Sequence, residues 1–127
     1  MEVVVAGLMI LMGVAIAGVW TRDILVGDKV DLGDGIFRAC DESGSLLWPH
    51  WLAEYTTAIL LLGAGVGLLV DTDWAPLLAA LALGALFYTS VNSLGWALAV
   101  ADRRAYVAPM VVGGLVSFVG TIWLLAR

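Results

Sequence analysis

Four long apolar segments, separated by polar ones, dominate the pattern of the chain. They cover residues 3–20, 51–70, 76–100 and 106–125. Each has close to the roughly 20 residues that an α-helix needs to cross the hydrocarbon core of a bilayer. The pattern therefore predicts an all-α integral membrane protein. We expect a single domain over residues 1–127, folded as an antiparallel bundle of four transmembrane helices.

The connections between these segments differ in length. The second and third are short and polar, and links this short make consecutive helices antiparallel neighbours. The first connection, residues 21–49, is about 30 residues long. Two Gly-Asp turn signals lie in it, between short apolar runs at residues 24–26 and 36–37. We expect these runs to pair as a short β-hairpin.

The overall composition agrees with a membrane protein. Hydrophobic residues make up 62% of the 127 residues and charged residues 13%, whereas charged residues make up about a quarter of a soluble domain. The formal net charge is −5. Because binding to phosphates needs clustered Lys and Arg, this acidic balance argues against nucleic acid as a partner. We expect the lipid bilayer to be the main partner.

Basic residues predict an orientation in the cell membrane. Five of the six lie in the first and third connections: Arg22, Lys29, Arg38, Arg103 and Arg104. An even number of spans places both termini on one side, and only Arg127 lies there. Because cytoplasmic loops carry an excess of Lys and Arg, this count favours termini outside the cell. Acidic residues scattered through the first connection make the bias small.

Glycines recur inside the predicted spans. They include Gly63 and Gly67, a Gly-x-x-x-Gly pair, with Gly7, Gly13 and Gly18 in the first span and Gly113, Gly114 and Gly120 in the fourth. In lipid, small residues favour association because they let helix backbones approach closely. We expect these glycines to serve packing within the bundle. The first and fourth spans have enough of them to suggest a homo-oligomer or a larger membrane complex as well.

Glu54 is the only ionisable residue well inside a predicted span. An unpaired carboxylate at that depth would cost several kcal/mol, so we expect Glu54 to be protonated, hydrogen-bonded or facing water. His50 precedes it by four residues and therefore shares its helix face. These two residues are the candidates for acid and base chemistry.

The third span carries a matching polar stretch. Tyr88, Asn92 and Trp96 fall at i, i+4 and i+8 and form a stripe, with Ser93 beside it. If the second and third spans pack together, these residues form a pocket with His50 and Glu54. The predicted binding residues are Tyr55, Tyr88, Asn92, Ser93 and Trp96.

Metal and cofactor sites are not expected. His50 is the only histidine and Cys40 the only cysteine, whereas a zinc site needs about three or four protein ligands. A haem held by two histidines of one chain is excluded for the same reason.

Three functions remain open from these residues. The first is a non-enzymatic subunit or oligomer-forming bundle with a polar pocket between the second and third spans. The second is a transporter or channel component that uses Glu54, which requires a polar route to both ends. The third is a membrane enzyme for a lipid-like substrate, with His50 and Glu54 as acid and base in a pocket closed at one end.

Overall fold

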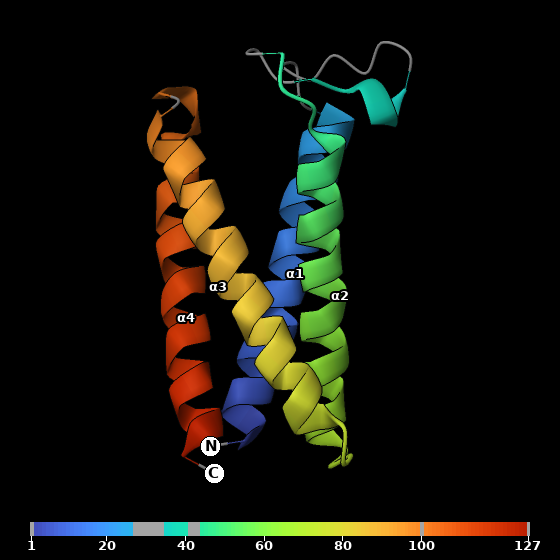
Figure 1. Ribbon diagram of the computed structural model, residues 1–127, viewed down its shortest axis with the longest axis vertical. Helices are drawn as coiled ribbons and strands as arrows, with labels where there is room; N and C mark the ends of the chain where they lie inside the picture. Colours follow the sequence, from blue (N-terminus) through green and yellow to red (C-terminus); the bar gives the residue numbers. More distant parts are fainter. Residues whose placement is uncertain (1, 27–34, 41–43, 100, 127) are drawn as a thin grey trace.

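The computed structural model describes residues 2–26, 35–40, 44–99 and 101–126. It contains four long helices, α1 (Glu2–Val26), α2 (Trp48–Leu69), α3 (Ala75–Ala99) and α4 (Val107–Leu125). Two short 3-10 helices, η1 (Ile36–Arg38) and η2 (Ala101–Tyr106), lie in the first and third connections. The helices alternate in direction, so α1 begins and α4 ends at the same end of the bundle (Figure 1). The prediction of four antiparallel helices is confirmed.

All four helices are long and apolar enough to cross a membrane. The first is longer than expected, because α1 continues to Val26 rather than ending near residue 20. No glycine or proline interrupts the chain between Trp20 and Val26, and charged residues alone do not end a helix. The charges at Arg22 and Asp23 mark the end of the apolar segment and not the end of the helix.

The expected β-hairpin is not confirmed. Residues 24–26, its first half, belong to α1, and residues 36–37, its second half, belong to η1. The turn between them, residues 27–34, lies outside the described residues. Within the described part of the first connection, one isolated antiparallel bridge joins Cys40 to Leu46.

The turn between α2 and α3 is tight. Asp71 adopts a left-handed conformation with φ 54°, which Asp tolerates better than most residues. The backbone N–H and the hydroxyl of Thr72 both donate to the carbonyl oxygen of Gly67, at 3.1 and 3.2 Å. This turn reverses the chain at the end of the bundle where the termini lie.

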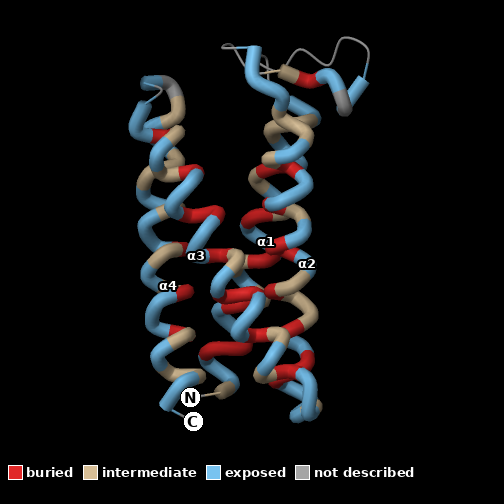
Figure 2. The backbone as a smooth tube through the Cα atoms, in the orientation of Figure 1, coloured by how far each residue is buried: buried red, intermediate tan, exposed pale blue. Residues whose placement is uncertain are grey.

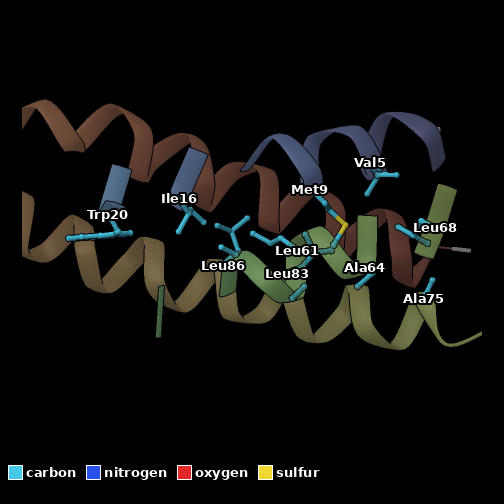
Figure 3. Packing of buried hydrophobic residues seen from close by; sticks show 14 of the residues in the cluster. Val5, Met9, Ile16, Trp20, Leu61, Ala64, Leu68, Ala75, Leu83 and Leu86 are labelled. Carbon is cyan, nitrogen blue, oxygen red and sulfur yellow. The ribbon is translucent and has the colours of Figure 1, made fainter. Parts of the chain in front are cut away.

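Apolar side chains fill the bundle at this same end, hereafter the termini end. Met9, Leu61, Leu83 and Leu86 are almost completely buried, and Figure 3 shows them meeting from α1, α2 and α3. Glycine sets how closely α1 approaches α2. A Cβ atom added at Gly65 would lie 2.9 Å from the carbonyl oxygen of Ala6. Gly65, which lies between the two glycines of the Gly-x-x-x-Gly pair, is therefore a point of close approach to α1. Gly13 of α1 is another, because an added Cβ atom there would lie 2.9 Å from the carbonyl oxygen of Ala58.

The helices form two hairpins, α1 with α2 and α3 with α4. The hairpins meet mainly where α2 packs on α3, while α1 and α4 have few contacts. In Figure 1, α3 starts beside α2 at the termini end and inclines toward α4 at the other end, hereafter the loop end. Much of α4 is exposed, and its buried residues are Gly113, Ser117 and Gly120 (Figure 2).

Candidate functional site

Glu54 lies deep between the two hairpins, toward the loop end. Its side chain belongs to α2 and is only 2% exposed. From α3, the Ser93 hydroxyl donates a hydrogen bond of 3.0 Å to Glu54 Oε1. A polar side chain of the neighbouring helix thus holds the carboxyl group, which reduces the cost of burying it.

His50 lies one turn nearer the loop end on the same face of α2. Its Nε2 atom is 3.8 Å from Glu54 Oε1, a distance too long for a hydrogen bond. Among the described residues, Nε2 of His50 is the only buried side-chain nitrogen or oxygen atom that has no hydrogen-bond partner. The imidazole packs edge-on against Trp20, with ring centroids 4.6 Å apart, and lies 6.3 Å from the ring of Trp96. Packing therefore fixes the ring, although its polar atom is unsatisfied.

A pocket of about 460 Å³ opens beside this histidine. Its lining residues are Ser45, Leu46 and Leu47 from the segment before α2, His50 from α2, and Asn92 and Trp96 from α3. Its volume falls within the range of small-molecule sites, about 300 to 1,000 Å³. Polar and apolar groups both line it, as is typical of sites that orient a ligand with a few hydrogen bonds.

Asp23 and Arg103 form an ion pair next to Trp96, which lines this pocket. Arg103 Nη1 lies 3.0 Å from Asp23 Oδ2, and the Tyr106 hydroxyl donates to Asp23 Oδ1 at 2.9 Å. The guanidinium lies over the ring of Trp96, 4.6 Å from its centroid. This group joins α1 to the segment after α3, so it connects the two hairpins at the loop end.

Three of the predicted binding residues, Tyr55, Tyr88 and Ser93, do not line the pocket. Ser93 donates to Glu54 instead. Tyr88 is 69% exposed on the outer face of α3. Positions four apart are rotated by about 40° around a helix, so the stripe that contains Trp96 and Asn92 has turned outward by Tyr88. The hydroxyl of Tyr55 forms a 2.8 Å hydrogen bond with Thr21 and joins α2 to α1 instead. Whether any of these residues binds a ligand stays a prediction.

The polar pocket differs from two other cavities of the bundle. A cavity of about 220 Å³ at the termini end is lined by apolar residues and one glycine from α1, α3 and α4. Another of about 280 Å³, between α3 and α4, has Ser90 as its single polar side chain. Within the described residues, no group of three His, Cys, Asp or Glu side chains could hold a metal ion.

Comparisons with known proteins give a family but no activity. No curated protein and no solved structure matches the chain significantly. One family of proteins, described as a domain of unknown function (DUF8058), matches residues 1–127, and the chain therefore belongs to this family.

Proposed function

We propose that the protein is a four-span, non-enzymatic membrane subunit that binds a small ligand in the pocket at its loop end. One observation carries the proposal: the pocket is lined by His50, whose buried Nε2 atom has no hydrogen-bond partner. Leaving a buried polar atom unsatisfied costs about 1 to 3 kcal/mol. Such a cost is common at sites where a ligand, and not the protein alone, completes the hydrogen bonding.

Insertion in a membrane is supported by the outer surface of the helices. Large apolar side chains are exposed along all four, for example Leu11, Ile59, Leu77 and Phe118. An apolar surface of this extent is unfavourable in water and suits lipid chains. The predicted orientation, with the loop end in the cytoplasm and both termini outside, is part of the proposal.

Ligand binding is favoured over the alternatives by the arrangement around His50. A purely structural bundle would pair all of its buried polar groups and would need no polar pocket. Transport through one chain would require a polar route to the termini end, but Met9, Leu61 and Leu83 are closely packed there. An acid and base pair would require both groups at the pocket wall, whereas Glu54 lies behind His50 and is almost completely buried.

Association with further copies is a second part of the proposal. The glycines of α4 at positions 113 and 120 pack against Ser90 and Leu83 of α3, so the bundle itself uses them. On α1, Gly7 and Gly18 have no atom within 4 Å of an added Cβ. These two glycines support a contact between α1 and a neighbouring chain in a homo-oligomer.

Phenol is a suitable neutral probe of the pocket, because it combines an apolar ring with one hydroxyl group. Since His50 is the only histidine, ¹⁵N-histidine labelling gives the NMR signal of this single side chain. Titration of the labelled protein in lipid nanodiscs with phenol should shift the ring resonances and reach saturation. The variant Asn92→Phe, which fills the pocket, should abolish the saturable shift.

The matched control is Leu98→Phe. Leu98 is exposed on the same helix and does not line the pocket, so this variant should respond to phenol like the wild type. A shift that grows linearly with phenol, or one that persists unchanged in Asn92→Phe, would refute the proposed function.

A further inference from the structure

The apolar cavity of about 220 Å³ at the termini end lies between α1, α3 and α4. Because α1 and α4 have few contacts with each other, this side of the bundle is incompletely packed. Met9 of α1 and Leu83 of α3 form the floor of the cavity, and both are almost completely buried (Figure 3). Leu8, Leu115 and Val119 form its rim and are exposed. The cavity is therefore open to the surroundings of the bundle between α1 and α4.

Every described side chain that lines this cavity is apolar. Seven are those of Val, Leu and Met, and the eighth lining residue is Gly120. The neighbouring hydroxyl groups of α4 donate to their own helix: Ser117 to the carbonyl oxygen of Gly114 at 2.7 Å, and Thr121 to that of Ser117 at 2.8 Å. Since a buried water molecule needs about two to four polar partners, water is unfavourable here. An occupant without polar groups fits the walls.

The volume of the cavity suits hydrocarbon. An apolar protein cavity of about 150 Å³ takes up benzene, so a cavity of about 220 Å³ has room for a short stretch of a hydrocarbon chain. An empty cavity destabilises a protein, because the atoms of its walls lose dispersion contacts that an occupant would supply. Hydrocarbon that can reach the opening should therefore enter it.

The cavity lies at the depth of lipid chains in a bundle that spans a membrane. Its lining residues fall within positions 5–9 of α1 and 115–120 of α4, which places them within about 15 Å of the helix ends. Half of the hydrocarbon core is about 15 Å thick, so the cavity faces the leaflet at the termini end. Exposed apolar residues on adjacent turns, Leu11, Val112 and Phe118, continue the surface of the rim.

A lipid chain fits the opening better than a helix of a second copy. Helices in membranes approach closely where small residues meet, whereas large side chains form this rim. Among the described residues that line the cavity, Gly120 is the one small residue, and it already packs on α3: an added Cβ atom there would lie 3.1 Å from Leu83 Cδ1. The opening therefore admits a flexible chain and keeps a second helix at a distance.

We propose that the apolar cavity binds one acyl chain of a lipid from the leaflet at the termini end. The chain lies on Met9 and Leu83 and supplies the packing that α1 and α4 do not give each other. The headgroup of the lipid stays at the membrane surface. The proposal rests on the membrane insertion that is part of the proposed function, and it is independent of the pocket beside His50.

Methyl NMR in lipid nanodiscs tests whether a chain reaches the floor of the cavity. The protein is deuterated except for the ε-methyl groups of methionine, and the Met9 signal is assigned by its loss in Met9→Leu. With protonated lipid chains, we expect a nuclear Overhauser effect between the Met9 methyl group and chain methylene protons. Lipid outside the cavity does not reach Met9, because neighbouring side chains bury it.

Val116→Phe fills the cavity, which Val116 lines, and should abolish the effect. The matched control Val112→Phe adds the same side chain one turn earlier, at an exposed position that does not line the cavity, and should leave the effect unchanged. Persistence of the effect in Val116→Phe would overturn the proposal. If Val116→Phe does not fold, wild-type protein in lipid with deuterated chains decides: the effect should vanish, and its persistence would show that the occupant does not come from the bilayer.

The variant Leu11→Met separates the proposal from membrane insertion. Leu11 is exposed on α1, so the methyl group introduced there should contact lipid chains whether or not the cavity is filled. Absence of the effect at this methyl group and at Met9 would refute the membrane insertion of the proposed function. Absence at Met9 alone would overturn the acyl-chain site and leave membrane insertion intact.

Discussion

The same helices pack against one another in different ways at the two ends of the bundle. At the termini end, alanines, glycines and a few large apolar side chains bring α1, α2 and α3 into close contact. At the loop end, the contacts between the hairpins include a buried carboxyl group, an ion pair and a pair of tilted aromatic rings. Among the described residues, every buried side-chain nitrogen or oxygen at the termini end has a hydrogen-bond partner, whereas Nε2 of His50 at the loop end has none. The difference separates an end that holds the fold together from the end where we propose that a small ligand binds.

The largest effect should come from a glycine at the termini end. A side chain at Gly65 meets the α1 backbone at Ala6, so Gly65→Val should lower the free energy of unfolding by about 3 kcal/mol. Unfolding by SDS in mixed micelles measures this change. Gly84→Val is the matched control, since an added Cβ at Gly84 meets nothing within 4 Å. Equal effects of the two variants would show that close approach at Gly65 does not determine stability.

A smaller effect should come from the buried hydrogen bond at the loop end. Ser93→Ala removes the donor to Glu54 Oε1 and should lower the free energy of unfolding by about 1 kcal/mol. Ser117→Ala is the control: Ser117 is equally buried, but its hydroxyl donates to Gly114 of its own helix at 2.7 Å. The prediction fails if both variants unfold at the same SDS concentration, because the bond between helices would then add nothing.

The smallest effect on stability should come from the ion pair. Arg103→Gln breaks the 3.0 Å contact with Asp23 and should cost about 0.5 kcal/mol. The exposed neighbour Arg104 provides the control variant Arg104→Gln, which should have no measurable effect. The ion pair also joins the hairpins, so distances between spin labels at positions 25 and 99 should spread more widely in Arg103→Gln. An unchanged distance distribution would mean that the ion pair does not hold this end together.

Sequence alone could place much of this architecture because helix geometry is local. The four apolar segments, and the shared face of His50 and Glu54, follow from a period of 3.6 residues. Counting residues from the loop end also predicts that Trp96 lies near the level of Glu54 and that Asn92 lies one turn deeper. The structure places these two residues of α3 beside α2 as expected, although their role in binding remains to be tested.

Other features could not be read from local patterns. The hydrogen bond between Arg103 and Asp23 joins residues 80 positions apart, and it depends on α1 extending past the apolar segment. One available signal was the order of aromatic and charged residues at the loop end, since Asp23 follows Trp20 and Arg103 follows Trp96. The contacts of Tyr55 and Tyr88 depend on small helix rotations, which the spacing of residues does not define.

Access of water to the pocket is the most direct test of the central claim. In a Cys40→Ser background, Asn92→Cys and Tyr88→Cys place one thiol on either side of the predicted boundary between pocket and lipid. Both native side chains are exposed on α3, about 6 Å apart along its axis, but only Asn92 lines the pocket. In proteoliposomes, a water-soluble maleimide should label Asn92→Cys at least ten times faster than Tyr88→Cys, and phenol should slow that labelling. Equal rates at the two positions would contradict a water-accessible pocket at the loop end of a membrane-embedded bundle.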